Sequence, residues 1–146
     1  MKQENYPFDG SARWISLPGR CRGSRKAPVL PAPYLRKNFF IQRSVHNPRI
    51  RICGIGFYEL YVNGQRVGDQ VLDPAPSQYD RRARYVTHSV GPLLKKGENT
   101  VGVILGNGWY NNYDSTWHFD AAPWNDYPKM LLQLEDDNGL ICASDP

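Results

Sequence analysis

Cysteine is scarce in this sequence, and its three cysteines lie far apart. Cys21, Cys53 and Cys142 show no C-x-x-C spacing, so they predict neither a disulfide framework nor a zinc site. Cys53 falls in an apolar segment and is interpreted as a small core residue. For the other two, a Cys21–Cys142 disulfide is the open alternative.

Long apolar runs are also missing, because 13 glycines and 12 prolines divide the chain into short segments. No segment approaches the roughly 20 apolar residues of a membrane-spanning helix, and positions 1–7 lack the apolar core of a signal peptide. The sequence therefore predicts a soluble chain without a membrane partner. Its length suits a single domain at 1–146 that folds alone and buries roughly 70% of its unfolded surface.

Positive charge is not concentrated in any one stripe. Lys and Arg number 18 against 14 Asp and Glu, and the excess is spread over short clusters at 20–26 and 81–84. A nucleic-acid partner is not predicted, because no recognisable reading element accompanies these clusters. They are interpreted as solvated loops, or as arginines that dock onto a neighbouring domain.

Metal-ligating residues are not grouped either. His46, His88 and His118 have no second ligand at a metal-binding spacing, so they are expected to be surface or packing residues. The sequence Asp-Asp-Asn-Gly at 136–139 lacks the alternating ligands of a calcium loop and is interpreted as a hairpin turn. No metal and no cofactor are predicted.

A β-hairpin within 52–68 is the clearest feature that is present. The segment 57–62 reads FYELYV, which has the period of a half-buried strand. Phe57, Leu60 and Val62 are expected on one side of the strand, and the two tyrosines and the glutamate on the other. Asn63-Gly64 follows as a type I′ turn, because Asn tolerates positive φ and Gly adopts it freely.

The remaining segments add further short strands and almost no helical period. Strands are expected at 11–15, 34–41, 49–53, 83–90, 100–105, 129–135 and 140–143. Gly54 and Gly56 are expected to mark a bend or a bulge. The segment 71–79 is expected to be an ordered crossing loop, the segment 93–99 one helical turn or a short connector, and the segment 18–33 a mobile loop. The predicted fold is all-β, an antiparallel β-sandwich of jelly-roll type.

The segment 109–127 gathers aromatic residues among Asn, Asp and His without any regular period. Sugars present apolar C–H faces to flat rings, and their hydroxyls need polar partners, so this composition favours carbohydrate contact. The predicted contact residues are Trp117, Trp124, Tyr113 and His118. In the alternative, these rings close one end of the sandwich or dock on another domain. Trp109, next to a strand end, is interpreted as structural.

Three motifs in this order resemble one known family. They are YLRKNF at 34–39, GIGFYELYVNG at 54–64 with VGD at 67–69, and LGNGWY at 105–110. Together they are similar to the amino-terminal domain of bacterial α-L-rhamnosidases, glycoside hydrolase family 78, over about Trp14 to Asp145. The hairpin alone also resembles the related sugar-binding-like domains of β-galactosidases and β-glucuronidases.

The resemblance implies a galactose-binding-like accessory domain that aids substrate recognition or docks on a catalytic (α/α)6 barrel of the same polypeptide. It also implies an inverting glycosidase whose paired acids lie in that barrel. No catalytic residue can be assigned here, so the chain alone is expected to be inactive and its carboxy-terminal edge truncated. The implied ligand is a rhamnose-containing oligosaccharide or glycoside. The sequence leaves the compartment open between the bacterial cytoplasm and the periplasm.

A second hypothesis is an autonomous carbohydrate-binding or structural module of another glycoside hydrolase. Sequence beyond Pro146 distinguishes the two hypotheses, because a barrel with paired acids belongs to the first and a stop codon to the second.

Overall fold

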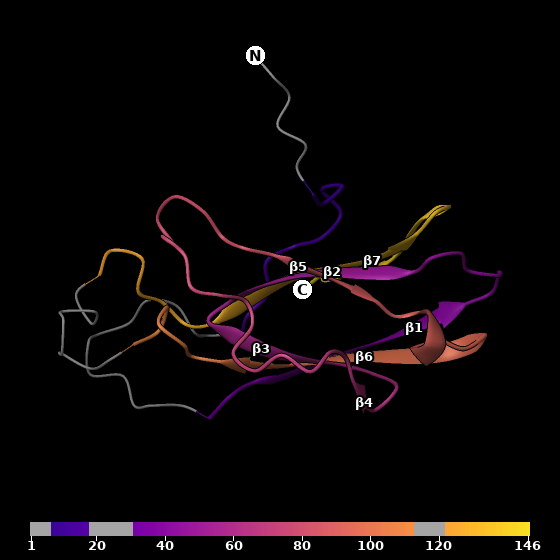
Figure 1. Cartoon of the computed structure of the whole chain (residues 1–146), viewed down its shortest axis with the longest axis horizontal. Helices are drawn as coiled ribbons and strands as arrows, with labels where there is room; N and C mark the ends of the chain where they lie inside the picture. Colours follow the sequence, from indigo (N-terminus) through magenta and orange to yellow (C-terminus); the bar gives the residue numbers. More distant parts are fainter. Residues whose placement is uncertain (1–6, 18–30, 113–121) are drawn as a thin grey trace, which may run out of the picture.

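Two antiparallel sheets face each other in this chain (Figure 1). The computed structural model describes residues 7–17, 31–112 and 122–146. One sheet has the strand order β1-β6-β3-β4, and the other has the order β5-β2-β7-β8. The strands of the first sheet are β1 (Tyr34–Ile41), β3 (Phe57–Val62), β4 (Gln65–Arg66) and β6 (Gly97–Gly106). Those of the second are β2 (Arg49–Ile55), β5 (Val86–Ser89), β7 (Lys129–Asp136) and β8 (Gly139–Ala143). The predicted all-β sandwich is confirmed, while its jelly-roll type stays a prediction.

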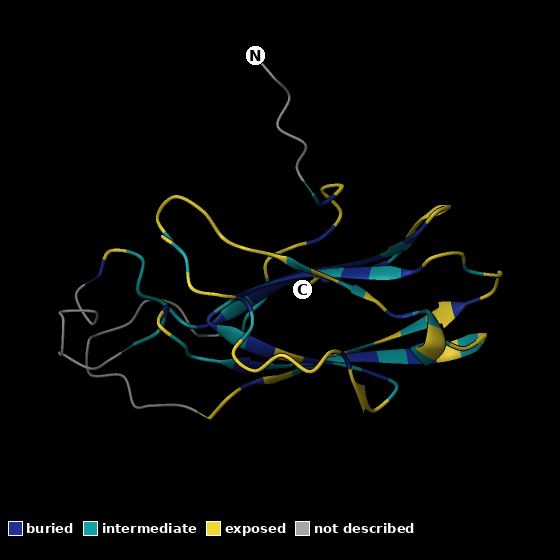
Figure 2. Ribbon diagram, in the orientation of Figure 1, coloured by how far each residue is buried: buried dark blue, intermediate teal, exposed yellow. Residues whose placement is uncertain are grey.

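The core lies between the sheets and takes alternate residues from the longer strands, above all β2, β3, β6 and β7 (Figure 2). Its most deeply buried side chains are Ile50, Ile52, Leu60, Leu105, Leu132, Leu134, Val62 and Val90. A smaller cluster of Phe8, Ala12, Cys53 and Leu131 covers the outer face of the second sheet, where the amino-terminal segment crosses it (Figure 1). Burial raises the pKa of the Cys53 thiol to about 12, which fits its predicted role as a small core residue.

Two details of the predicted strands are wrong. In β3 the buried side chains are Tyr58, Leu60 and Val62, so Tyr58 takes the place expected for Phe57. The reason is strict alternation, because Phe57 is an odd number of positions from Leu60 and must face the other way. Residues 11–15 form no strand, and only Ile15 pairs there, exchanging two 2.9 Å backbone hydrogen bonds with Met130 of β7.

Gly56 moves the chain from one sheet to the other. β2 ends at Ile55 in the second sheet, and β3 begins at Phe57 in the first. Gly56 has a φ of +108°, and a Cβ placed on it would lie 2.3 Å from the carbonyl oxygen of Gly106. The predicted bend is therefore confirmed at Gly56, since only glycine accepts both this backbone angle and this close approach. Gly54 marks no bend, because it lies within β2 and pairs with Met130 of β7.

The crossing loop is ordered, as predicted, and it is tied to β3 of the first sheet. Tyr58 donates its backbone N–H to the carbonyl oxygen of Asp73 at 2.9 Å. The hydroxyl of Tyr58 lies 3.0 Å from Nε2 of His88 in β5. His88 is thus a packing residue, and its half-buried position lowers its pKa.

Cys53 and Cys142 are free and buried, and Cys21 lies outside the described residues. Within the three described ranges, no helix could cross a membrane and no group of His, Cys, Asp or Glu could hold a metal ion. The predicted helical turn is one 3₁₀ turn, η1 (Gly91–Leu93), slightly earlier than expected.

A pair of hydrogen-bonded asparagines, of which Asn99 is buried and Asn63 half-buried, connects the hairpin turn to β6. Asn63 donates from Nδ2 to Oδ1 of Asn99 at 2.8 Å and to the carbonyl oxygen of Leu93 at 2.8 Å. Asn99, 1% exposed, accepts from the backbone N–H of Lys95 and donates to the carbonyl oxygens of Lys95 and Gly97. The predicted turn is confirmed, with φ values of 51° at Asn63 and 81° at Gly64.

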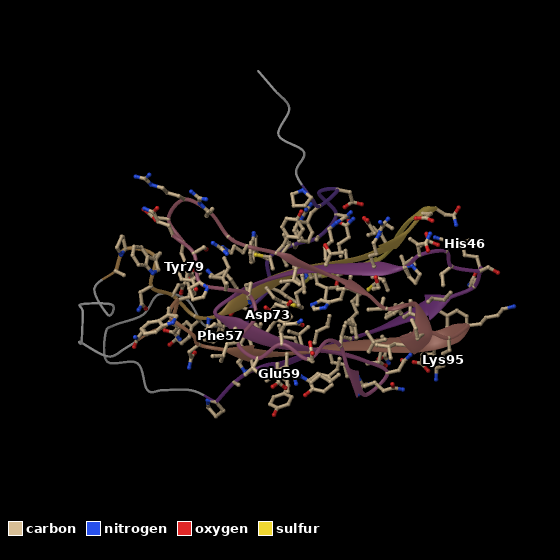
Figure 3. All side chains as sticks on the ribbon, in the orientation of Figure 1. His46, Phe57, Glu59, Asp73, Tyr79 and Lys95 are labelled. Carbon is tan, nitrogen blue, oxygen red and sulfur yellow. The ribbon has the colours of Figure 1, made fainter. Side chains whose placement is uncertain are left out.

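At the same end of the sandwich, Asp136 joins the β7–β8 turn to the loop before β2. Its carboxylate accepts from Nη2 of Arg43 at 2.7 Å and from the backbone N–H groups of His46 and Asn138. The Arg43 guanidinium, helped by these N–H groups and opposed by burial, holds the pKa of Asp136 well below its usual range. In Figure 3, His46 and Lys95 lie at the end opposite to Tyr79.

Replacing Gly64 by Val is expected to lower the free energy of unfolding by about 1–3 kcal/mol, the usual cost of a strained backbone position. A Cβ at Gly64 meets no atom within 4 Å, so the loss comes from the positive φ alone. Chemical denaturation measures the change, with Gln65→Val in the exposed strand β4 as the matched control. Equal stability of both variants contradicts the turn assignment.

Acid is expected to destabilise the fold through Asp136. Because its pKa is lower when folded, the unfolded chain binds the extra proton, and stability is lost as the pH falls below about 4, the ordinary Asp value. Asp136→Asn should therefore lower the melting temperature at neutral pH and flatten its decline between about pH 5 and pH 2. Asp145→Asn, at an exposed carboxylate paired with Lys37, is the control and should keep the wild-type slope. Parallel curves for Asp136→Asn and wild type contradict the assignment.

Candidate functional site

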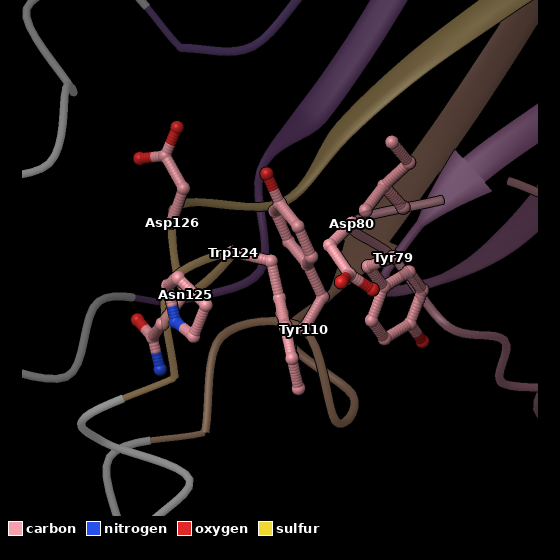
Figure 4. Close-up of a pocket in the computed structure, with 8 residues that line it drawn as sticks. Tyr79, Asp80, Tyr110, Trp124, Asn125 and Asp126 are labelled. Carbon is pink, nitrogen blue, oxygen red and sulfur yellow. The ribbon is translucent and has the colours of Figure 1, made fainter. Parts of the chain in front are cut away.

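An aromatic hollow opens at the end of the sandwich away from the two networks described above (Figure 4). It has a volume of about 360 Å³, near the lower limit of typical small-molecule sites. The residues that line it are Ile55, Tyr79, Asp80, Tyr110, Pro123, Trp124, Asn125 and Asp126. Two connections that are distant in sequence, one between β4 and β5 and the other between β6 and β7, supply nearly all of them.

Each segment is held by its own hydrogen bonds. After β6 the chain turns so that Asn111 donates its backbone N–H to the carbonyl oxygen of Asn107 at 3.1 Å, which fixes Tyr110. In the crossing loop, the N–H groups of Arg81 and Arg82 each donate to the carbonyl oxygen of Gln78 at 2.9 Å, beside Tyr79. These turns place rings from separate loops around one space.

The segment that precedes β7 carries Trp124 and is tied to the segment after β6. Asn125 donates its backbone N–H to the carbonyl oxygen of Ala122 at 3.0 Å. Its side-chain Nδ2 donates to the backbone carbonyl oxygen of Asn112 at 2.6 Å. The side-chain bond fixes the position of Trp124 relative to Tyr110.

The rings of the hollow differ in exposure. Tyr110 is 7% exposed and packs edge-to-face on Tyr79, with 5.2 Å between the ring centroids. Trp124 is half-buried, and Figure 4 shows it and Tyr79 on either side of Tyr110. Trp109, expected to be structural, is 48% exposed, so Tyr110 is the residue that closes this end.

The polar groups of the hollow include one ion pair. Nζ of Lys129 lies 2.8 Å from Oδ2 of Asp126 and 5.6 Å from the centroid of the Tyr110 ring. Burial lowers the pKa of Lys129, but the bond to Asp126 and the nearby Tyr110 outweigh it and the pKa is raised. For Tyr79, burial raises the pKa, so its hydroxyl stays protonated at neutral pH.

This arrangement offers groups that suit the binding of a polar ring-shaped ligand. It presents ring faces, an amide, a protonated phenol and the carboxylate of Asp126, whose charge is balanced by Lys129 beside the hollow.

Of the predicted contact residues, Trp124 lies in the hollow. Tyr113, Trp117 and His118 fall outside the described residues, so their roles stay predictions. Tyr79 and Asp80 were not anticipated, because they lie at the end of the crossing loop, about 30 positions before the aromatic segment, and only the fold brings the two together.

The family model for the N-terminal domain of α-L-rhamnosidases matches residues 43–140. An α-L-rhamnosidase of Formosa agariphila is 39% identical over 89% of this chain and 16% of its own length. The chain therefore spans about a sixth of the length of this curated relative.

Solved structures give the same result. The α-L-rhamnosidase from Dictyoglumus thermophilum superposes with a TM-score of 0.72 at 33% identity, covering 99% of this chain and 16% of that one. The Streptomyces avermitilis α-L-rhamnosidase complexed with L-rhamnose has a TM-score of 0.65 at 28% identity, over 82% of this chain and 12% of that one.

Proposed function

The chain belongs to the α-L-rhamnosidase N-terminal domain family, and from this membership we propose that it serves an α-L-rhamnosidase as a substrate-recognition domain. Its partner is the catalytic domain of the same polypeptide, and its ligand a rhamnose-containing oligosaccharide or glycoside. A module of some other glycoside hydrolase is not favoured, because the relatives described above are α-L-rhamnosidases.

The aromatic hollow is the observation that supports recognition. A half-buried indole beside fixed phenol rings offers flat apolar faces, and amide and carboxylate groups stand at the same opening. This combination matches the apolar C–H face and the hydroxyl rim of a sugar ring. Trp124 is the proposed contact residue, with Tyr113, Trp117 and His118 proposed from the sequence.

Hydrolysis is assigned to the catalytic domain. An inverting glycosidase needs two carboxyl groups about 6.5–9.5 Å apart, one of them a general acid. In the hollow, Asp126 already accepts from Lys129 and from the backbone N–H of Tyr127. This pairing suits a structural carboxylate.

Rhamnose-containing oligosaccharides should bind the hollow with a Kd on the order of 1 mM, because one or two rings gain little over the cost of association. Binding is measured by tryptophan fluorescence and by shifts of backbone amide signals at residues 79–80, 110 and 124–126. Trp124→Ala should abolish the amide shifts with a small change in melting temperature. Amide signals are needed for this variant because the substitution also removes a fluorophore.

Two controls accompany that titration. Trp14→Ala removes another exposed tryptophan, 41% exposed, and should leave binding intact. Tyr110→Ala should instead cost about 3 kcal/mol or more, the scale for a buried aromatic ring. Unshifted amides around the hollow at high ligand concentration, or unfolding of Trp124→Ala, would show that the hollow is packing or a docking surface.

The 146-residue chain should not release p-nitrophenol from p-nitrophenyl α-L-rhamnoside, because the proposed acids lie in another domain. Release is followed by absorbance, with a complete family enzyme as the positive control. Turnover by the purified chain that is lost in an Asp→Asn variant contradicts this assignment.

A further inference from the structure

A second pocket lies on the outer face of the β5-β2-β7-β8 sheet and shares no residue with the aromatic hollow. It has a volume of about 410 Å³ and is lined by Pro7, Phe8, Asp9, Arg51, Tyr85, Gln133 and Glu135. Arg51 of β2 lies directly across from Gln133 of β7. Both side chains are on the outer face of the sheet, because their neighbours Ile52 and Leu132 face the core. We call it the outer-face pocket.

The floor of the outer-face pocket is a fixed polar network. Nη1 of Arg51 lies 2.5 Å from Oε1 of Glu135, with side chains only 24% and 16% exposed. Gln133, 2% exposed, donates to Oε2 of Glu135 at 2.9 Å and accepts the backbone N–H of Asp9 at 3.0 Å. Because these side chains are already fixed, ligand binding costs little of their conformational entropy.

This floor keeps hydrogen-bonding capacity. In the described part of the chain, Arg51 makes its polar contact with Glu135, and a guanidinium carries five N–H donors. Glu135 accepts from Arg51 and Gln133, and two carboxylate oxygens offer about four acceptor positions. Adjacent donors and acceptors of this kind match the vicinal hydroxyls of a sugar.

An aromatic wall stands beside the floor. Tyr85, just before β5, is 47% exposed, and its ring packs edge-to-face on Phe8 at 6.0 Å. Phe8 is itself 6% exposed within the outer cluster, so it anchors the tyrosine. An exposed ring held in position offers its face to the apolar side of a ring-shaped ligand.

The charge of the pocket selects against anions. One guanidinium faces two carboxylates, and Asp9 is already bonded to the N–H and hydroxyl of Ser11. With Arg51 neutralised by Glu135, a negative ligand meets no free cation here. We propose that the outer-face pocket is a second ligand site, which takes one uncharged sugar ring and is separate from the aromatic hollow.

The test is an amide-shift titration of the 146-residue chain with methyl α-L-rhamnopyranoside, methyl β-D-glucopyranoside and methyl β-D-glucuronide. At least one neutral glycoside should shift residues 85–89 and 133–135 with a Kd on the order of 1 mM. The glucuronide differs from the glucoside by a carboxylate and should bind more weakly. Absence of shifts at these residues with both neutral glycosides, or shifts with the glucuronide alone, overturns the proposal.

Single substitutions test whether these amide shifts arise from binding in the outer-face pocket. Tyr85→Ala should weaken binding about tenfold, as loss of one aromatic contact predicts, while Tyr85→Phe should keep most of it. Tyr34→Ala, at a tyrosine 77% exposed on the other sheet, is the matched control. Trp124→Ala should leave these shifts unchanged, which separates this site from the aromatic hollow. Equal binding by Tyr85→Ala and Tyr34→Ala overturns the proposal.

Discussion

The hydrogen-bonded pair Asn63–Asn99 is the constraint on which one end of the sandwich depends. Asn63 also accepts the backbone N–H of Thr100 at 2.9 Å, so one side chain ties the hairpin turn to β6 and to the η1 connector. Asn99 is almost fully buried, and a buried amide left without partners costs about 1–3 kcal/mol. The turn, the connector and the central strand are therefore fixed as a unit.

This division of the molecule leaves the other end for the proposed recognition. The end with Asn99 and Asp136 commits its polar groups to internal bonds, and those groups lie within turns and strand ends. The opposite end carries the longer connections, where rings and amides border an open hollow. Loops on a rigid sandwich commonly carry binding residues because they vary without disturbing the core.

Local patterns in the sequence were enough to predict most of the strands, the Asn63-Gly64 turn and the bend at Gly56, because each depends on neighbouring residues. They failed at residues 11–15, where a plausible strand makes only one bridge at Ile15. Tyr79 joining the hollow and Glu135 joining Arg51 follow from pairings between distant segments. No period within one segment encodes such pairings, so the outer-face pocket was not predicted.

Weak single-ring sites become useful when one domain carries two of them beside a catalytic centre. Tethering makes the later binding events intramolecular, with effective concentrations in the millimolar range for short flexible links. A site with a Kd on the order of 1 mM is then substantially occupied once the substrate is held elsewhere, yet it still releases product readily. The aromatic hollow is built from loops, whereas the outer-face pocket lies on a sheet face and has different lining residues. The two proposed sites can therefore hold different rings of one branched glycoside. The rigid sandwich would set the distance between those rings, and spacing would then contribute to selectivity along with ring identity.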